Sequence, residues 1–276
     1  MRPDLAEFFR DFVLRRTGIV LAADKDYLLR TRLEPLARSE GLADVNTMMS
    51  TVRMQPTGPL AQKCLDAMAT HESFFFRDQT PFDAFRDDVL PRLARARPEG
   101  RLRVWCAACS SGQEPYSLGM LFLEERHKHP PLTLSIVATD ISEPILQRAR
   151  SGLYSDFETS RGLTPERRAR WFSSDRGTHK VVDDVRAMVQ FRRHNLLEPT
   201  AALGKFDVIF CRNVLIYFDR ATKQRVLDGL TDAVAPDGVI FLGAAETVVG
   251  LSGRLRPRPG LRGVFERTDA AAVRAA

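Results

Sequence analysis

The chain has 276 residues, of which 44% are hydrophobic and 28% are charged, and its net charge is +6. A chain of this length and composition can bury a core in one large domain or two smaller ones, which excludes an intrinsically disordered protein. It has no run of about 18 consecutive apolar residues and no signal-peptide pattern, so we expect a cytoplasmic protein without a membrane span.

The positive charge is concentrated in one segment. Residues 1–78 hold 11 basic and 11 acidic side chains, whereas residues 161–193 hold nine basic and four acidic ones. The chain therefore has one basic segment and is not basic throughout, as many nucleic-acid-binding proteins are.

The first part of the chain predicts a small all-α domain, which we expect over residues 1–72. Apolar side chains recur at helical spacing over residues 5–13. A second helix is expected over about 25–39, where Pro35 can kink it, and a third over 60–70. The second helix carries basic side chains at Lys25, Arg30, Arg32 and Arg38.

From about residue 100 onward, short apolar strands alternate with helices. The expected strands are "LRVWCAA", "LTLSIVATD", "KFDVIFCRN" and "GVIFLGAAE", with "LRGVFERT" as a late edge strand. The expected helices run through "PYSLGMLFLEER", through "SEPILQRARSG", and over 226–234 with an end at "PDG". Because continuous apolar strands need cover on both faces, we predict a doubly wound α/β domain over residues 73–276.

Residues from about 155 to 192 separate two expected sheet strands by more than a plain crossover needs. Within them "TPERRARWF" predicts a helix with Pro165 in its first turn. "THKVVDDVRAMVQFRR" alternates like hairpins around "DD" and "RG". We expect a small antiparallel β-subdomain inserted here, and its simplest interpretation is a solvated basic face.

The stretch "CAACSSGQEP" follows the first strand of the α/β domain and allows two interpretations. It could be a C-x-x-C redox or zinc pair, or a loop that holds a cofactor. A zinc site would need two more ligands, and neither Cys64 nor Cys211 belongs to a second close pair. Small residues after a strand let a ligand approach the backbone, so the βαβ context favours the cofactor loop. We therefore expect Cys64, Cys106, Cys109 and Cys211 to be free buried thiols, and we predict no metal site.

Two acids indicate the type of cofactor. Asp140 ends the second strand, where a carboxylate can accept hydrogen bonds from ribose hydroxyls. Glu114 in the turn would repel a pyrophosphate but attract an ammonium group, and the chain has no phosphate-loop or three-glycine dinucleotide motif. A nucleoside with a cationic, amine-bearing arm fits both acids, and S-adenosylmethionine is the common one.

A set of longer motifs makes the likeness to a known family specific. The motifs are, in chain order, "MATHESFFFRD", "RVWCAACSSGQEPYS", "ATDIS", "ARSGLY", "HNLLEP", "FDVIFCRNVLIYFD" and "PDGVIFLGAAE". Over nearly the whole chain the sequence resembles the bacterial chemotaxis methyltransferase (CheR) family. The resemblance implies an S-adenosylmethionine-dependent protein-glutamate O-methyltransferase, which forms methyl esters on the cytoplasmic helical domain of chemoreceptors and releases S-adenosylhomocysteine.

The resemblance also implies which residues form the site. The implied cofactor contacts are His71, Ser73, Arg77, Glu114, Asp140, Asn195, Leu196, Arg212 and Asn213. Glu114 would hold the methionine amine, Asp140 the ribose, and Asn195 with Leu196 the adenine side. Arg77 and Tyr217 are the implied catalytic residues, and they would position the acceptor by charge and hydrogen bond. His71 stands where the family often has asparagine.

The resemblance further implies the partners. The enzyme is expected to be a monomer that is recruited to receptor arrays, without inserting into the membrane and without a nucleic-acid partner. The insert is expected to touch the receptor, and the basic second helix to face its acidic methylation region. Some relatives hold a receptor's C-terminal peptide through a longer, glycine-rich turn in the insert. This chain has only "SSDRGTHK" there, so a peptide tether is not expected.

The residues leave three other functions open. A glutamate with a pKa of about 4.3 is already ionised at neutral pH, so its methylation needs no general base, and the sequence shows no catalytic triad or carboxylate pair. A small-molecule carboxyl methyltransferase would not need the helical domain and the basic insert. A nucleic-acid methyltransferase would suit the pI of about 9.4, but "CRNVLIY" is not an N-P-P-[YF] turn. A non-catalytic S-adenosylmethionine-binding signalling module is the third.

Overall fold

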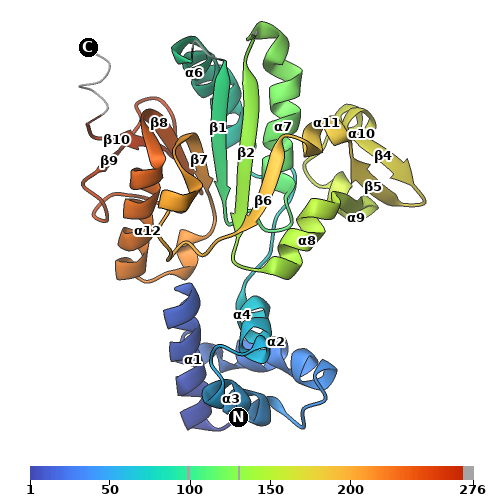
Figure 1. Ribbon diagram of the computed structural model, residues 1–276, viewed down its shortest axis with the longest axis vertical. Helices are drawn as coiled ribbons and strands as arrows, with labels where there is room; N and C mark the ends of the chain where they lie inside the picture. The colour runs from blue at the N-terminus through green and yellow to red at the C-terminus, as the bar shows by residue number, and fades with distance from the viewer. Residues whose placement is uncertain (98–99, 130, 270–276) are drawn as a thin grey trace. The chain divides into compact units, whose positions relative to one another are not determined.

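The computed structural model describes residues 1–97, 100–129 and 131–269 (Figure 1). The chain divides into two compact units. One, which we call the helical unit, comprises Met1–Thr70 and Tyr217–Thr222. The other, the α/β unit, comprises His71–Ile216 and the chain from Lys223 onward. Each unit has its own hydrophobic core.

The helical unit is a small all-α bundle, as predicted. Its elements are α1 (Pro3–Thr17), η1 (Ala23–Lys25), α2 (Asp26–Ser39), α3 (Val45–Met54) and α4 (Pro59–Met68). Gly18 ends α1 with a φ of 78°, a left-handed conformation that glycine adopts without strain. Sequence patterns alone did not predict α3, whose first turn is capped by Asp44 through a 2.7 Å hydrogen bond from the Thr47 amide.

The α/β unit is built on a sheet with the strand order β6-β2-β1-β7-β8-β10-β9. The strands are β1 (Arg101–Ala107), β2 (Thr133–Asp140), β6 (Val189–Arg193), β7 (Phe206–Cys211), β8 (Val234–Leu242), β9 (Leu255–Pro257) and β10 (Val264–Arg267). The strands β6, β2, β1, β7 and β8 are parallel to one another. The strand β10 is antiparallel to both of its neighbours, β8 and β9. Because the chain moves outward from β1 in both directions, the sheet is doubly wound, which confirms the predicted fold class.

Helices connect these strands and cover the sheet. They are α5 (Thr80–Ala84), the π-helical turn η2 (Phe85–Val89), α6 (Leu90–Ala96), α7 (Gln113–Glu125), η3 (Arg126–Lys128), α8 (Glu143–Ser151), η4 (Ala201–Leu203), η5 (Leu215–Tyr217) and α12 (Arg220–Ala233). The helices α7 and α8 follow β1 and β2, and both pack against β2 and β6 (Figure 1). Successive residues of a strand point to opposite faces of the sheet, and Val104 and Trp105 of β1 are both fully buried. The central strands are therefore buried on both faces.

Three details of the sheet differ from the sequence prediction. The strands β6 and β9 were not expected, because both are edge strands with one neighbour and lack a continuous apolar run. The helix expected to end at "PDG" ends earlier, at Ala233, and Val234 already begins β8. Asp237 of that motif accepts two hydrogen bonds from Arg97, at 2.7 and 2.8 Å. These bonds hold the "PDG" residues in β8.

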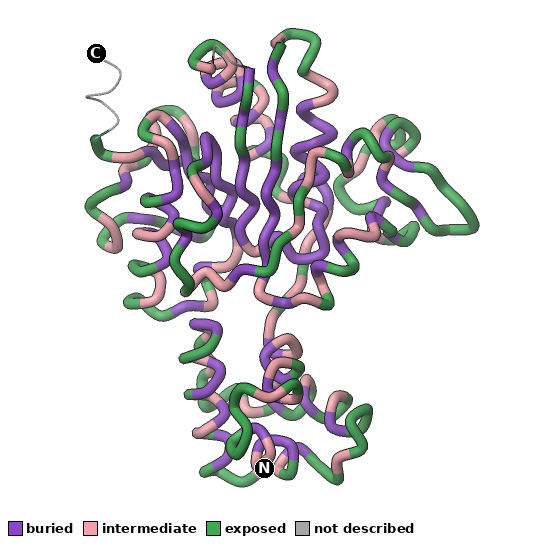
Figure 2. Tube along the Cα trace, in the orientation of Figure 1, coloured by how far each residue is buried: buried purple, intermediate pink, exposed green. Residues whose placement is uncertain are grey.

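The insert is a small antiparallel β-subdomain, as predicted, with the strand order β3-β5-β4. It contains β3 (Leu153–Ser155), α9 (Asp156–Ser160), α10 (Pro165–Trp171), β4 (Phe172–Asp175), β5 (Thr178–Val181) and α11 (Asp183–Arg186). The helix at Pro165 is confirmed, and so is the hairpin at "RG", whose Arg176 and Gly177 have φ values of 45° and 79°. The hairpin expected at "DD" is wrong, because those residues begin α11. The tip of the β4–β5 hairpin is exposed (Figure 2).

The insert is fixed to residues 71–78 at one glycine. Gly162 has a φ of 85°, and a Cβ placed on it would lie 1.8 Å from the carbonyl oxygen of Phe75. Phe75 itself is fully buried and packs edge-on against Phe172 of β4 and Tyr154 of β3. No side chain larger than hydrogen fits at Gly162 without moving the backbone.

We expect Gly162→Ala to lower the free energy of unfolding by roughly 2 to 4 kcal/mol, because it adds a clash with backbone to a left-handed strain. The control is Gly260→Ala, since Gly260 also has a positive φ, 78°, but no heavy atom lies within 4 Å of its added Cβ. That substitution should cost only about 1 to 2 kcal/mol. Chemical denaturation followed by circular dichroism measures both, and equal losses would contradict the close approach.

Candidate functional site

The loops that follow the central strands meet at one edge of the sheet. Ala107 at the end of β1 pairs with Thr139 of β2 and with Cys211 of β7, and Cys211 pairs with Leu242 of β8. The carboxyl ends of these parallel strands are therefore level. This edge is where doubly wound sheets bind ligands.

The loop after β1 is shaped to expose its backbone. Ala108, Ser110 and Gly112 all have positive φ values, of 59°, 51° and 93°. The Cys109 amide donates to the Thr139 carbonyl at 2.8 Å, which ties the loop to the end of β2. The buried hydroxyl of Ser110 has no hydrogen-bond partner in the part of the chain that the structure describes. A polar ligand would satisfy it.

Asp140 is a buried carboxylate beside this loop. Its Oδ2 accepts from the Ser110 amide at 2.9 Å and its Oδ1 from the Ser142 amide at 3.1 Å. Burial raises the pKa of Asp140, and these hydrogen bonds and nearby His71 oppose that rise. Each oxygen keeps acceptor capacity beyond its one amide, so the carboxylate can also accept from two hydroxyl groups of a ligand.

Glu114 lies in the first turn of α7 and is paired with a buried arginine. Arg212, whose side chain is only 2% exposed, donates to Glu114 Oε2 at 2.8 Å. Its Nη2 donates to Asp78 Oδ2 and to the Arg77 carbonyl, both at 2.8 Å. Burial raises the pKa of Glu114, and the charge of Arg212 opposes the rise. The structure thus joins three of the predicted site residues, Arg77, Glu114 and Arg212, in one network.

Glu246 is a functional candidate that the sequence analysis missed. It follows β8, is almost fully buried, and accepts hydrogen bonds from the amides of Asn213, Val214, Leu215 and Gly243, at 2.6 to 2.9 Å. Asn213 has a left-handed φ of 59°. Glu246 therefore holds the turn after β7, which carries Arg212 and Asn213. It follows Leu242, the last residue of β8, by four positions, and an acid this soon after a buried strand was the signal that could have found it.

The segment before α5 carries His71, Ser73 and Arg77. Its aromatic residues Phe75 and Phe76 are buried in the core of the α/β unit. Arg77 is half-buried as a residue; its guanidinium donates to the Glu72 carbonyl at 2.9 Å and lies 5.6 Å from the centre of the Phe74 ring.

Asn195 and Leu196 follow β6 and are half-buried. The residue before them, His194, donates its amide to the Asp140 carbonyl at 3.0 Å. The Asn195 side chain accepts from the Leu197 amide at 3.1 Å. The chain that carries the two predicted adenine contacts is thus bonded to the residue predicted to hold the ribose.

Tyr217 belongs to the helical unit, whereas the other predicted site residues belong to the α/β unit. It is half-buried, and its carbonyl accepts from the Val20 amide at 2.9 Å. The next residue, Phe218, forms an isolated antiparallel bridge with Ile19.

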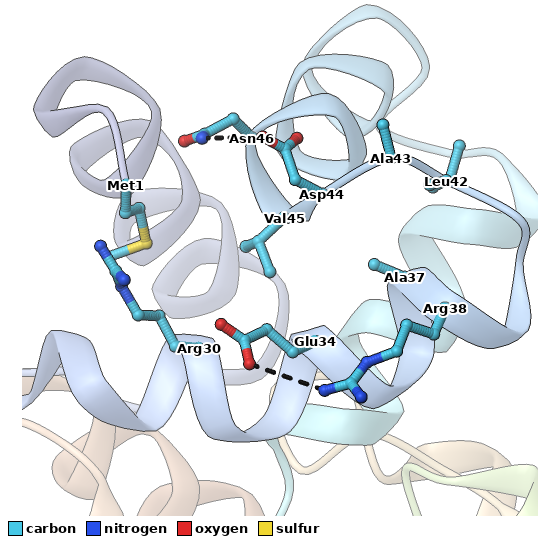
Figure 3. A pocket seen from close by; sticks show the side chains of 10 residues that line it. All are labelled: Met1, Arg30, Glu34, Ala37, Arg38, Leu42, Ala43, Asp44, Val45 and Asn46. Carbon is cyan, nitrogen blue, oxygen red and sulfur yellow. Dashed lines mark hydrogen bonds and ion pairs between the residues drawn. The ribbon is translucent and has the colours of Figure 1, made fainter.

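The basic residues of α2 have different environments. Arg32 donates to the carbonyls of Met68 and Ala69 and, at 2.9 Å, to the hydroxyl of Thr70, so it holds the end of α4. Arg30 and Arg38 are exposed and line a pocket of about 400 Å³ between α2 and the start of α3 (Figure 3). If α2 docks to a receptor as expected, its exposed residues Arg30 and Arg38 would make the contact.

Other chemistry finds little support in the described residues. All four cysteines are buried free thiols, as expected, and burial raises the pKa of Cys106 and Cys109 well above its usual value. Within residues 1–97, 100–129 and 131–269, no three or more His, Cys, Asp or Glu side chains gather where they could hold a metal ion. None of the helices described there is long and apolar enough to span a membrane.

Comparison with known proteins assigns both units to one family. Residues 5–69 match the all-alpha domain of CheR methyltransferases, and residues 71–262 match their SAM binding domain. The chemotaxis protein methyltransferase of Vibrio parahaemolyticus is 42% identical, with 92% of this chain and 94% of that chain covered. The chemotaxis protein methyltransferase Cher2 of Pseudomonas putida is 41% identical, with 89% and 90% covered.

Among solved structures, the glycopeptide N-methyltransferase MtfA complexed with S-adenosylmethionine has a TM-score of 0.35 and 17% identity, with 72% of this chain and 71% of that chain covered. A likeness at this level adds nothing to the assignment. The two family matches and the relatives cover nearly the whole chain, and the chain therefore belongs to the CheR methyltransferase family, which binds S-adenosylmethionine.

Proposed function

We propose that this protein transfers a methyl group from S-adenosylmethionine to glutamate side chains of bacterial chemoreceptors, forming glutamate methyl esters. The observation that carries the proposal is the buried carboxylate of Asp140, anchored to the loop after β1 and beside a chain that leads to Asn195. The proposed acceptor is supported by the family membership and by relatives that are named chemotaxis protein methyltransferases.

The residues present fit S-adenosylmethionine. The hydroxyl of Ser110 is buried without a partner among the described residues, and both oxygens of Asp140 can accept further hydrogen bonds. Glu114 uses Oε2 for Arg212, so its Oε1 can accept from an ammonium group. Asp140 would hold the ribose, Glu114 the methionine amine, and Asn195 with Leu196 the adenine side. His71, Ser73 and Asn213 would complete the contacts.

The proposed reaction depends more on the positioning of the acceptor and the methyl group than on proton transfer. When bound, S-adenosylmethionine supplies an electrophilic methyl group on its sulfonium. A glutamate side chain is ionised at neutral pH, so its oxygen can attack that methyl without a general base. Arg77 would offset the cost of removing the acceptor carboxylate from water, because a cation nearby stabilises the ionised form. Tyr217 would orient the acceptor oxygen by a hydrogen bond.

The partners follow from this function. The protein would work in the cytoplasm as a monomer, recruited to receptor arrays, with the insert and the exposed arginines of α2 facing the receptor helices. The alternatives that remain are a small-molecule carboxyl methyltransferase and a non-catalytic S-adenosylmethionine-binding signalling module. Neither gives a role to the helical unit and the insert together.

Asp140→Asn should weaken the binding of S-adenosylhomocysteine by roughly 1 to 3 kcal/mol, because charge-assisted hydrogen bonds to the ribose become neutral ones. Titration calorimetry measures the affinity. The control is Asp175→Asn in the β4–β5 hairpin, where the same change of an exposed carboxylate should leave the affinity as it is. An unchanged affinity for Asp140→Asn would remove that residue from the site.

The turn between β4 and β5 predicts that receptors are bound without a peptide tether. It consists of Arg176 and Gly177 in left-handed conformation, which leaves no long glycine-rich loop. Deleting the last residues of the receptor should therefore leave the initial methylation rate within about twofold, measured at a receptor concentration below KM. A tenfold loss of rate would show that the hairpin holds the receptor's C-terminus.

Incubation with labelled S-adenosylmethionine should place a base-labile label on receptor helices, released as methanol, because esters hydrolyse in base and N-methyl groups do not. Tyr217→Phe should lower kcat while the affinity for S-adenosylhomocysteine changes by no more than about threefold, since a positioning hydrogen bond acts chiefly in the transition state.

Four other results would each reject the proposal when RNA and free small acids are offered beside the receptors. A base-stable label, or a label on RNA, would identify a different acceptor. A label on free small acids but not on receptors would favour the small-molecule enzyme, and cofactor binding without any transfer would favour the signalling module.

A further inference from the structure

Arg161 of the insert lies beside the segment that carries Arg77. Its guanidinium carbon is 4.3 Å from the centre of the Phe74 ring, the same ring against which Arg77 lies at 5.6 Å. Its Nη2 is 3.3 Å from Glu72 Oε1. Two cationic side chains, one from the insert and one from residues 71–78, therefore share one aromatic support.

The backbone holds Arg161 in this place. The residue after it, Gly162, lies so close to the Phe75 carbonyl that a Cβ would not fit. Phe75 is locked between Tyr154 and Phe172 of the insert. Arg161 thus has a fixed base next to the proposed acceptor site, although its side chain remains 44% exposed.

The arginines of α10, which begins four residues after Arg161, have different partners. Arg167 donates to both oxygens of Glu124, at 3.1 and 2.8 Å, and Arg168 donates to Asp156 at 2.6 Å. Arg170 is exposed and lies over the ring of its neighbour Trp171. Arg167 also contacts residues 71–78, since it lies 3.9 Å from the centre of the Phe76 ring, but its side chain is only 19% exposed. Among these insert arginines, Arg161 is the exposed one that contacts residues 71–78.

Glu72 is a weak partner for Arg161. Its side chain is 61% exposed, and the pair is longer and less direct than the two-point contact of Arg167 with Glu124. Exposed ion pairs contribute little, because water screens them and both side chains lose freedom. A second carboxylate with better geometry can therefore replace Glu72 at low cost, and the planar guanidinium of Arg161 suits two-point binding of a carboxylate.

We propose that Arg161 is a specificity-determining residue, which binds a carboxylate of the acidic receptor segment next to the acceptor glutamate. Glu72 occupies Arg161 in the free enzyme and is displaced when the receptor docks. This inference rests on the proposed function, since it requires an acidic protein acceptor. It adds a residue of the insert to the proposed site. It also assigns a role in acceptor recognition to one residue of the basic segment 161–193.

The test compares initial rates of methyl-ester formation over a range of receptor concentrations, at saturating S-adenosylmethionine and low ionic strength. Arg161→Gln should raise the KM for the receptor by roughly five- to twentyfold, with kcat within about twofold. Arg170→Gln, which removes the same charge from an exposed site in the insert, should change KM by less than about twofold. Glu72→Gln should lower KM by roughly two- to fivefold, because it removes the competing carboxylate.

The double variant Glu72→Gln/Arg161→Gln separates recognition from structure. If Glu72 acts only by occupying Arg161, its substitution should no longer lower KM once Arg161 is gone. An Arg161→Gln enzyme that behaves like Arg170→Gln, or a Glu72→Gln effect that persists in the double variant, would overturn the inference.

Titration with S-adenosylhomocysteine shows whether each variant is folded. Should Arg161→Gln fail to bind it, Arg161→Lys and Glu72→Gln decide: a KM raised by the first and lowered by the second supports the inference, and an unchanged KM in both overturns it. A wild-type enzyme that puts no methyl ester on receptors would reject the proposed function together with this inference. Normal wild-type activity with an unchanged KM in the Arg161 variant rejects the inference alone.

Discussion

The burial of Arg212 is the constraint on which the rest of the site depends. A guanidinium with 2% of its side chain exposed must have its charge compensated, because an unpaired buried charge is strongly destabilising. The chain meets this requirement with Glu114, Asp78 and the Arg77 carbonyl, which come from α7 and from the turn before α5. One charge at the end of β7 thereby fixes the positions of two segments that precede it by about a hundred residues.

Glu246 is a second buried charge at the same end of β7, and its charge is negative. It is an acid compensated by backbone amides instead of by a cation, and four of them donate to it. Gly243 is needed in this arrangement, because a Cβ there would come within 2.8 Å of the Glu246 carboxylate and 2.9 Å of the Asn213 amide. Together the hydrogen bonds of Arg212 and Glu246 hold the turn after β7, residues 212–215.

Sequence patterns predicted those parts of the fold that local chemistry decides. The strands β1, β2, β7 and β8 contain continuous apolar runs, and Pro165 in the first turn of α10 is a local signal. The strand β6 was not predicted, because an edge strand has one neighbour and needs no continuous apolar run. The partners of Glu114 and Glu246 escaped prediction because they lie 98 and about 30 residues away in the sequence, and no spacing rule reports such pairs.

His179 shows the same limit within the insert. Its sequence neighbours offered no partner at ligand spacing, yet it is buried and lies 2.7 Å from both Ser174 Oγ and Asp156 Oδ1. The hydrogen bond with His179 is the main reason that the pKa of Asp156 is lowered. The network joins α9, β4 and β5, which are brought together only by folding, and it stabilises a subdomain too small to build a large core of its own.

The charges around the site bear on how an acidic cofactor site could attract the anionic acceptor that we propose. Glu114, Asp140 and Glu246 all lie at the carboxyl edge of the sheet, and the charge of Arg212 is already shared between Glu114 and Asp78. Arg212 therefore has little positive potential left for a substrate. Arg77 donates to a neutral carbonyl, and the carboxylate that Arg161 contacts is the exposed Glu72. In the proposed function, attraction for a receptor carboxylate within the α/β unit would come from these last two arginines, at the junction of residues 71–78 with the insert.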